Sequence, residues 1–283
     1  MYYKGGVKID KQILSPQEIA SVWSQIGENK ANLPVFKMFL LGIFAGVFIG
    51  FGANASIVVT QTLGSNVDGG LAKFFGAAVF PVGLMLVVMA GGELFTGNNL
   101  LTLAVLDKRI TASRMLLNWA VVYLGNLVGS LALAFMLAHS GLYGSESMAA
   151  RSVEIATAKV SMTFMQAFIR GILCNILVVL ACWMQAASPD MTGKILALWF
   201  PIMLFVLSGF EHSVANMFFI PVGKFIGAGI TWGQFWIKNI IPVTLGNMVG
   251  GAVIVPLTYH VCYSKTGPGT GVKGAANREP GFK

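Results

Sequence analysis

The sequence Ser208-Gly209-Phe210-Glu211-His212 interrupts an apolar run that resumes from Val214 to Val222. A similar interruption, Gly91-Gly92-Glu93, comes before the short apolar run Asn99 to Leu106. Each resumed run is too short to cross a bilayer, because a spanning helix needs about 20 residues. Non-helical backbone at membrane depth is tolerated only where it is buried in protein or lines a water-filled cavity. The two breaks therefore predict a membrane protein with a path for solutes, and helix N-termini at the midplane would suit an anion.

The composition agrees with a chain that crosses a membrane several times. Of its 283 residues, 55% are hydrophobic and 11% are charged, against roughly 25% charged residues in an average soluble domain. This excludes an ordinary globular protein. The apolar segments expected to span are Met38 to Thr60, Leu71 to Ala90, Met115 to Ala138, Phe164 to Ala187, Ile195 to Leu207 and Ile240 to Tyr263.

Several short motifs occur twice, in the same order and at nearly constant spacing. The segment Leu124 to Gly129 matches the segment Leu245 to Gly250, 121 residues later. The other matches are Asn118 with Asn239, Ile110-Thr111 with Ile230-Thr231, and Gly91-x-Glu93-x4-Asn98 with Gly209-x-Glu211-x4-Asn216. Four matches in register predict two halves of three spans each. Because three is odd, the halves enter the membrane from opposite sides, as in channels and secondary transporters.

The predicted fold is therefore an all-α membrane protein of six transmembrane helices, in a 3+3 inverted repeat with broken second and fifth helices. A helix bundle without transport function is the alternative. The net charge of +8 could indicate nucleic acid. However, most lysines and arginines fall on the N-terminal side of the six spans, which is the positive-inside pattern of a protein with both termini in the cytoplasm. We expect the lipid bilayer, and no nucleic acid, as a partner.

Residues 38–263 form the predicted channel domain, and a shorter segment lies on each side of it. In residues 1–37, Ser15-Pro16-Gln17-Glu18 has the pattern of a capped helix start, followed by one apolar stripe. We expect an amphipathic helix that lies on the membrane surface or on its own bundle, or that covers a pore. Residues 264–283 are rich in Gly, Lys and Pro, so we expect a disordered cytoplasmic tail.

Ionisable residues inside spans are costly and therefore suggest function. Glu93 and Glu211 occupy matching positions beside the two breaks, so each carboxyl group is expected to satisfy backbone N–H groups freed there. Arg170 lies near the start of the fourth span, where its side chain can reach outward to the membrane surface. His212 has Leu94 as its counterpart, so the repeat does not require an imidazole at this position.

His212 can handle a proton, because the pKa of histidine is nearest neutrality, or it can be a structural donor to a carbonyl. Thr96, as a hydroxyl donor, and Asn175, as an amide donor, are expected near it. Both could equally form hydrogen bonds between helices. No pattern predicts a metal or cofactor, and the motifs of an intramembrane hydrolase, Gly-x-Ser-Gly or His-Glu-x-x-His, do not occur. We do not expect an enzyme.

Two segments resemble the signatures of the formate/nitrite transporter family: Gly92-Glu93-Leu94-Phe95-Thr96-Gly97, and Ser208 to Met217. The resemblance extends from about the first span to the sixth. It implies a pentamer of aquaporin-like protomers in a prokaryotic inner membrane, each with a pore for small monoacids. Formate is the first expectation, and nitrite or hydrosulfide are alternatives. An aquaporin-like channel for neutral solutes is less favoured, since Asn-Pro-Ala is absent at both breaks.

The resemblance also implies roles for single residues. His212 matches the pore histidine, Thr96 the threonine of the first loop, Lys159 the vestibule lysine and Asn175 the central asparagine. The hydrophobic constrictions match Phe80, Leu84, Leu94, Phe95 and Phe205. Four polar residues at the helix breaks have a structural role in this interpretation: Glu93, Asn98, Glu211 and Asn216. The implied anion is either neutralised by a proton before it crosses, or passes as a charge while His212 only donates a hydrogen bond.

Overall fold

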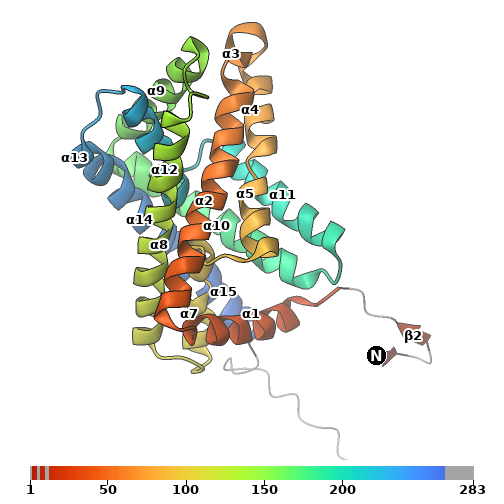
Figure 1. The fold of residues 1–283 in the computed structure, drawn as a ribbon. Helices are drawn as coiled ribbons and strands as arrows, with labels where there is room; N and C mark the ends of the chain where they lie inside the picture. The colour runs from red at the N-terminus through yellow and green to blue at the C-terminus, as the bar shows by residue number, and fades with distance from the viewer. Residues whose placement is uncertain (1, 5–6, 10–12, 265–283) are drawn as a thin grey trace, which may run out of the picture.

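The computed structural model describes residues 2–4, 7–9 and 13–264, so the predicted tail lies outside the described residues except for Ser264. A short antiparallel pair of strands precedes a chain of helices (Figure 1). In order, the elements are β1 (Tyr2–Lys4), β2 (Val7–Ile9), α1 (Pro16–Ala31), α2 (Val35–Thr60), α3 (Leu63–Asn66), α4 (Gly69–Val79), α5 (Val82–Met85), η1 (Leu86–Gly91), α6 (Phe95–Asn98), α7 (Leu101–Leu106), α8 (Ala112–His139), α9 (Glu146–Val160), α10 (Phe164–Ala187), α11 (Met191–Leu207), α12 (Ser213–Ile226), α13 (Trp232–Gln234), η2 (Phe235–Ile240), α14 (Ile241–Met248), η3 (Val249–Ile254) and α15 (Val255–Tyr263). The segments η1, η2 and η3 are π-helical.

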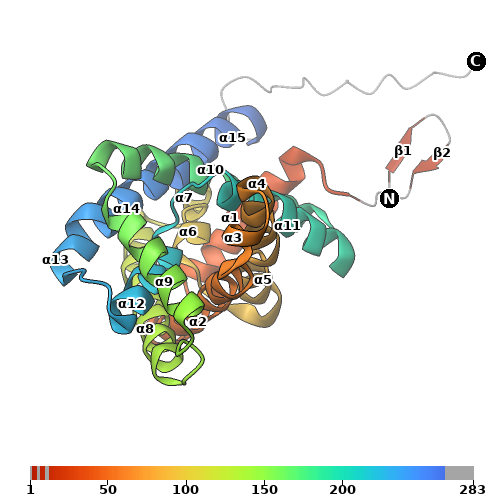
Figure 2. The same cartoon turned by 90° about the horizontal axis from the view of Figure 1, so that it is seen from above.

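Five helices in the described part of the chain are long and apolar enough to cross a membrane. They are Val35–Thr60, Gly69–Gly91, Ala112–His139, Phe164–Ala187 and Trp232–Tyr263. Each contains one of the predicted spans. The remaining predicted span, Ile195 to Leu207, lies in α11, which has only 17 residues and extends away from the other helices in Figure 2.

The chain leaves helical geometry at two places between apolar helices. Gly91 has φ 99° and Gly92 is extended before α6 begins at Phe95. Gly209 has φ 72°, and α12 begins directly after His212. Glycine adopts a positive φ without the steric cost of a Cβ atom, so both interruptions occur where the sequence supplies one.

Close backbone contact between glycines joins α2 to α8 and α10 to α14. A Cβ atom on Gly129 of α8 would overlap the carbonyl of Ile43, and one on Gly246 of α14 would overlap the carbonyl of Phe168. Small residues four apart allow helices in a membrane to approach this closely. The same type of contact therefore holds one helix pair in each half of the chain.

Helices α1 and α9 lie at opposite ends of the long helices (Figure 1). The predicted capping box of α1 is confirmed, with the Ser15 backbone N–H donating to the Glu18 carboxylate at 2.8 Å. Ile19 and Trp23 are buried, and Trp23 Nε1 donates to the carbonyl of Cys182 at 3.2 Å. The helix therefore packs on its own bundle through its apolar stripe, and its role as a cover over a pore stays a prediction.

Candidate functional site

The first helix break is held by a network centred on Glu93. Its carboxylate accepts from Lys30 Nζ of α1 at 2.8 Å and from Asn98 Nδ2 at 2.7 Å. Asn98 also donates to Asn118 Oδ1 at 2.9 Å, and Asn118 donates to the Lys30 carbonyl at 3.2 Å. Glu93 is only 5% exposed. A buried carboxylate needs such partners, because burial of an unpaired charge is costly.

The second break has the same network, built from the corresponding residues. The Glu211 carboxylate accepts from Lys159 Nζ of α9 at 3.0 Å and from Asn216 Nδ2 at 2.6 Å. Asn216 donates to Asn239 Oδ1 at 2.8 Å, and Asn239 donates to the Lys159 carbonyl at 2.9 Å. One lysine, one glutamate and two asparagines therefore occupy each end of the molecule.

Two further asparagines form hydrogen bonds with the backbone groups freed at the breaks. The sequence predicted this role for the carboxyl groups of Glu93 and Glu211 instead. Asn126 Oδ1 accepts from the Phe95 backbone N–H at 2.9 Å, and Asn126 Nδ2 donates to the carbonyls of Gly42 and Glu93. Asn247 makes the equivalent bonds at the second break, with Ser213, Gly171 and Glu211. The carboxylates are left free to pair with the lysines.

The two breaks meet at Thr96 and His212, both of which are buried. The Thr96 hydroxyl oxygen lies 2.8 Å from His212 Nε2. His212 Nδ1 accepts from the Ala215 backbone N–H at 3.1 Å, at the start of α12. Since Nδ1 accepts, the proton of a neutral imidazole is on Nε2, which donates to Thr96.

Asn175 of α10 lies next to this pair, and its amide group bonds other parts of the protein. Its Nδ2 donates to Asn99 Oδ1 and to the Asn247 carbonyl, both at 2.8 Å, and more weakly to the Thr96 carbonyl at 3.3 Å. Its Oδ1 is buried without a hydrogen-bond partner in the described part of the chain. An unpaired buried acceptor is costly, and nothing in the described part of the chain offsets that cost here.

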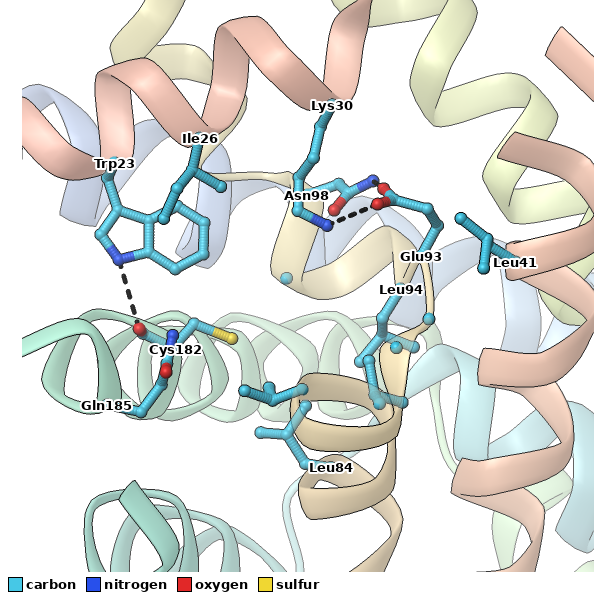
Figure 3. Close-up of a pocket in the computed structure, with 15 residues that line it drawn as sticks. Trp23, Ile26, Lys30, Leu41, Leu84, Glu93, Leu94, Asn98, Cys182 and Gln185 are labelled. Atoms are coloured by element: carbon cyan, nitrogen blue, oxygen red, sulfur yellow. Dashed lines mark hydrogen bonds and ion pairs between the residues drawn. The ribbon is translucent and has the colours of Figure 1, made fainter. Parts of the chain in front are cut away.

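A cavity of about 280 Å³ opens beside α1 and leads toward the first break (Figure 3). Lys30 and Glu93 line its charged part, where Lys30 reaches down from α1. Leu84 and Leu94 line its apolar part, and Cys182 and Gln185 of α10 complete one wall. The ion pair thus lies between α1 and Leu84 (Figure 3).

A second cavity, of about 130 Å³, lies at the α9 end and reaches His212. Lys159 and Glu211 form its charged part. Phe80 and Phe205 form its apolar part, with ring centroids 5.6 Å apart, and the Phe205 ring stacks on the His212 imidazole at 5.9 Å. Each cavity thus combines a lysine–glutamate pair with apolar side chains.

Phe95 is the one predicted constriction residue that lines neither of these cavities. Its ring packs edge-on against Tyr123 at 4.8 Å and Trp119 at 6.1 Å. These side chains line an apolar pocket between α8 and α14, where the Tyr123 and Thr244 hydroxyl groups are 2.8 Å apart. In this structure Phe95 supports the pore wall from behind.

Sequence reasoning missed the roles of Lys30, Asn126 and Asn247, although it predicted Asn98 and Asn216 at the breaks. The signal for Lys30 was present, because Lys30 precedes Lys159 by 129 residues and Gly42 precedes Gly171 by the same number. The repeat therefore extends beyond the spans to α1 and α9, where it matches the two lysines.

The donor groups of the site suit an anion. They are ammonium, amide, hydroxyl and imidazole groups, and the carboxylate in each cavity, Glu93 or Glu211, is already paired with a lysine. Within residues 2–4, 7–9 and 13–264, no group of three or more His, Cys, Asp or Glu is placed to hold a metal ion.

Comparison with known proteins supports the same conclusion. The family described as formate/nitrite transporter matches residues 17–261. A protein of Methanothermobacter thermautotrophicus named "Probable formate transporter" is 45% identical over 89% of this chain and 97% of its own length. The formate channel FocA of Haemophilus influenzae is 40% identical over 88% of this chain and 94% of its own. A solved pentameric formate channel with formate bound has a TM-score of 0.73 and 36% identity, and covers 81% of this chain and 97% of that one. The chain belongs to the formate/nitrite transporter family.

Proposed function

We propose that this protein is a membrane pore for formate, which crosses at the site of Thr96 and His212. The observation that carries the proposal is the hydrogen bond between these residues, which come from the two helix breaks and are buried between apolar layers. Few water molecules can reach a buried layer of this kind. The hydroxyl and imidazole groups can form hydrogen bonds with formate or formic acid there in place of water. The relatives named as formate channels or transporters support formate as the substrate.

The proposed architecture is a 3+3 inverted repeat in which α11 is the short fifth span. Two observations support it: the ion pairs of Lys30 and Lys159 lie at opposite ends, and the bonds of Asn126 and Asn247 correspond one to one. The proposed assembly is a pentamer in a prokaryotic inner membrane, with both termini in the cytoplasm. The likeness to a pentameric formate channel supports the number of subunits, and the positive-inside pattern supports the orientation.

The first step in the proposed mechanism is collection of the anion at a charged mouth. Lys159 and Lys30 provide the positive charge, and a cation in a cleft raises the local concentration of an anion. Each lysine is paired with a glutamate. It therefore attracts an anion but binds it less tightly than an unpaired lysine would.

The second step is loss of the charge before the apolar layers. Phe80 and Phe205 at one end, and Leu84 and Leu94 at the other, offer no partner to an ion, and an unpaired charge is expensive there. A low dielectric favours the neutral form of an acid. Formate therefore takes up a proton on entry and crosses as formic acid.

The proton comes from water, while His212 acts as a hydrogen-bond donor. A neutral imidazole that gave up its Nε2 proton would become an anion, and protonation of Nδ1 would break its bond from Ala215. The Nε2–H group and the Thr96 hydroxyl thus orient the acid as it passes. The alternative, in which formate passes as an anion beside a neutral His212, remains a separate outcome of the flux measurements.

Uptake into proteoliposomes tests the proposed substrate. Purified protein is reconstituted, and uptake of formate, nitrite, hydrosulfide and glycerol is compared with that of empty vesicles. We expect formate to enter fastest and glycerol to be excluded. Faster entry of nitrite or hydrosulfide would reassign the substrate within the family, and entry of glycerol alone would remove the proposed function.

A further inference from the structure

Arg170 is a charged residue that the proposed pore does not use. It is the seventh residue of α10, so it lies about 9 Å along the helix from Phe164 at 1.5 Å per residue. Its carbonyl accepts from the Glu211 backbone N–H at 3.2 Å, which places Arg170 level with the second helix break. The residue is exposed in the isolated protomer.

The guanidinium of Arg170 has no partner in the described part of the chain. None of the ion pairs or side-chain hydrogen bonds there includes it. Glu211, the acid adjacent through the backbone, is already paired with Lys159 and Asn216. A guanidinium cannot lose its proton in a protein, so within a membrane-spanning helix it requires an anion from elsewhere.

The fold itself does not require a charge at this position. In the first half, the Glu93 backbone N–H donates to the Leu41 carbonyl at 3.1 Å, just as Glu211 donates to Arg170. Leu41 is therefore the structural counterpart of Arg170. The same backbone bond forms with a leucine, so the arginine serves something other than the helix break.

The exposed face of α10 around Arg170 changes from polar to apolar along the helix. Gln166, one turn toward the start of α10, is exposed, and Leu173, one turn further in, is apolar and 40% exposed. Leu177 continues the apolar stripe on the same face. Along this face a polar side chain is followed by a cation and then by apolar side chains. This arrangement is complementary to an amphiphile, whose anionic head would contact the cation and whose apolar chain would contact the leucines.

We propose that Arg170 binds the phosphate of an anionic phospholipid in the leaflet at the α9 end, with an acyl chain along Leu173 and Leu177. A guanidinium can donate two parallel hydrogen bonds to one phosphate. In the described part of the chain no carboxylate pairs with Arg170, and Glu211, which bonds its carbonyl, is already paired with Lys159, so no acid is available for the ammonium of a zwitterionic headgroup. Phosphatidylglycerol, whose headgroup carries only the negative charge, therefore fits the site better than phosphatidylcholine.

Thermal unfolding of the purified full-length protein in detergent tests the proposal. Wild type, Arg170→Leu, Arg170→Lys and Lys238→Leu are titrated with phosphatidylglycerol, phosphatidylcholine or inorganic phosphate. Lys238 is the matched control, because it is an exposed cation seven residues into the last membrane-crossing helix, with no ion pair in the described residues. Leucine at position 170 reproduces Leu41, so the variant is expected to fold.

We expect phosphatidylglycerol to raise the melting temperature of wild type and Lys238→Leu. Arg170→Leu should need at least about tenfold more lipid for the same rise, and Arg170→Lys should fall between, because lysine cannot bind phosphate bidentately. An equal loss in Lys238→Leu would overturn the proposal in favour of a general charge effect. An equal rise with inorganic phosphate would also overturn it, since no acyl chain would then be needed.

Native mass spectrometry of the same samples separates the remaining alternative, a carboxylate of a neighbouring copy. We expect Arg170→Leu to keep the subunit number of wild type and to lose bound phosphatidylglycerol. If the variant instead dissociates and its surviving oligomers retain the lipid, Arg170 belongs to a subunit contact and the lipid site is wrong. The readouts do not depend on formate flux, so failure here leaves the proposed pore untouched.

Discussion

The hydroxyl oxygen of Thr96 lies 2.8 Å from Nε2 of His212, so one hydrogen bond joins the two interrupted helices of the protein. Each residue comes from a different half of the chain, 116 positions apart. His212 Nδ1 is occupied by the Ala215 N–H, which fixes the direction of the ring. Thr96 is therefore the hydrogen-bond partner of the other ring nitrogen, Nε2.

Thr96→Val should slow formate uptake by roughly ten- to a hundredfold. Valine has the same shape but leaves the buried Nε2–H unpaired, which costs about 1–3 kcal/mol. Thr96→Ser retains the hydroxyl and should keep most of the flux. Flux in proteoliposomes is measured together with the melting temperature. Equal rates for the valine and serine variants would show that the hydroxyl has no part in transport.

The lysine at the α9 end should govern the salt dependence of uptake. Glu211→Gln leaves the Lys159 ammonium without its carboxylate partner and raises the net charge of this cavity by one, whereas Lys159→Met/Glu211→Gln removes both charges and leaves the net charge unchanged. Glu211→Gln should take up formate about tenfold faster than the double variant at low ionic strength, and the difference should shrink in high salt. Glu93→Gln and Lys30→Met/Glu93→Gln are the matched variants at the other end. A difference that salt does not change would contradict collection of the anion by charge.

Asn247→Leu should strongly destabilise the protein. The amide group of Asn247 bonds three buried backbone groups, of Ser213, Gly171 and Glu211. Each group left unpaired costs about 1–3 kcal/mol, so the melting temperature should fall by many degrees. Asn29→Leu on the exposed face of α1 is the control and should change it little. Similar melting temperatures for both variants would mean that water replaces the amide.

Gly129→Ala should separate α2 from α8 and reduce stability. A Cβ atom there overlaps the backbone carbonyl of Ile43, which cannot move aside as a flexible side chain could. Gly229→Ala is the control, because a Cβ atom at Gly229 meets nothing within 4 Å. We expect a loss of about 1–3 kcal/mol in the first variant only. Chemical or thermal unfolding of both variants checks this, and an unaffected Gly129→Ala would show that the helices are less closely packed than described.

Much of the fold could be predicted because the signals are local. The apolar run ending at Ala187 and the glycines at the two breaks act within a few residues of chain, through burial in lipid and positive φ. Contacts between distant residues were not predictable in this way. Asn126 caps Phe95 from another helix, and the ring of Phe95 turns away from the path although its neighbour Leu94 lines it. The packing of neighbouring helices determines the orientation of such side chains, and a match to a short sequence motif does not predict it.

The neutral-acid route is tested most directly by simultaneous measurement of formate and proton entry into proteoliposomes that contain a pH-sensitive dye. An inward formate gradient should carry one proton with each formate, and His212→Asn should slow both fluxes together, because asparagine cannot present the imidazole Nε2–H to the acid. Formate entry without protons, at a rate that does not change in His212→Asn, would contradict both the proton uptake and the role of His212.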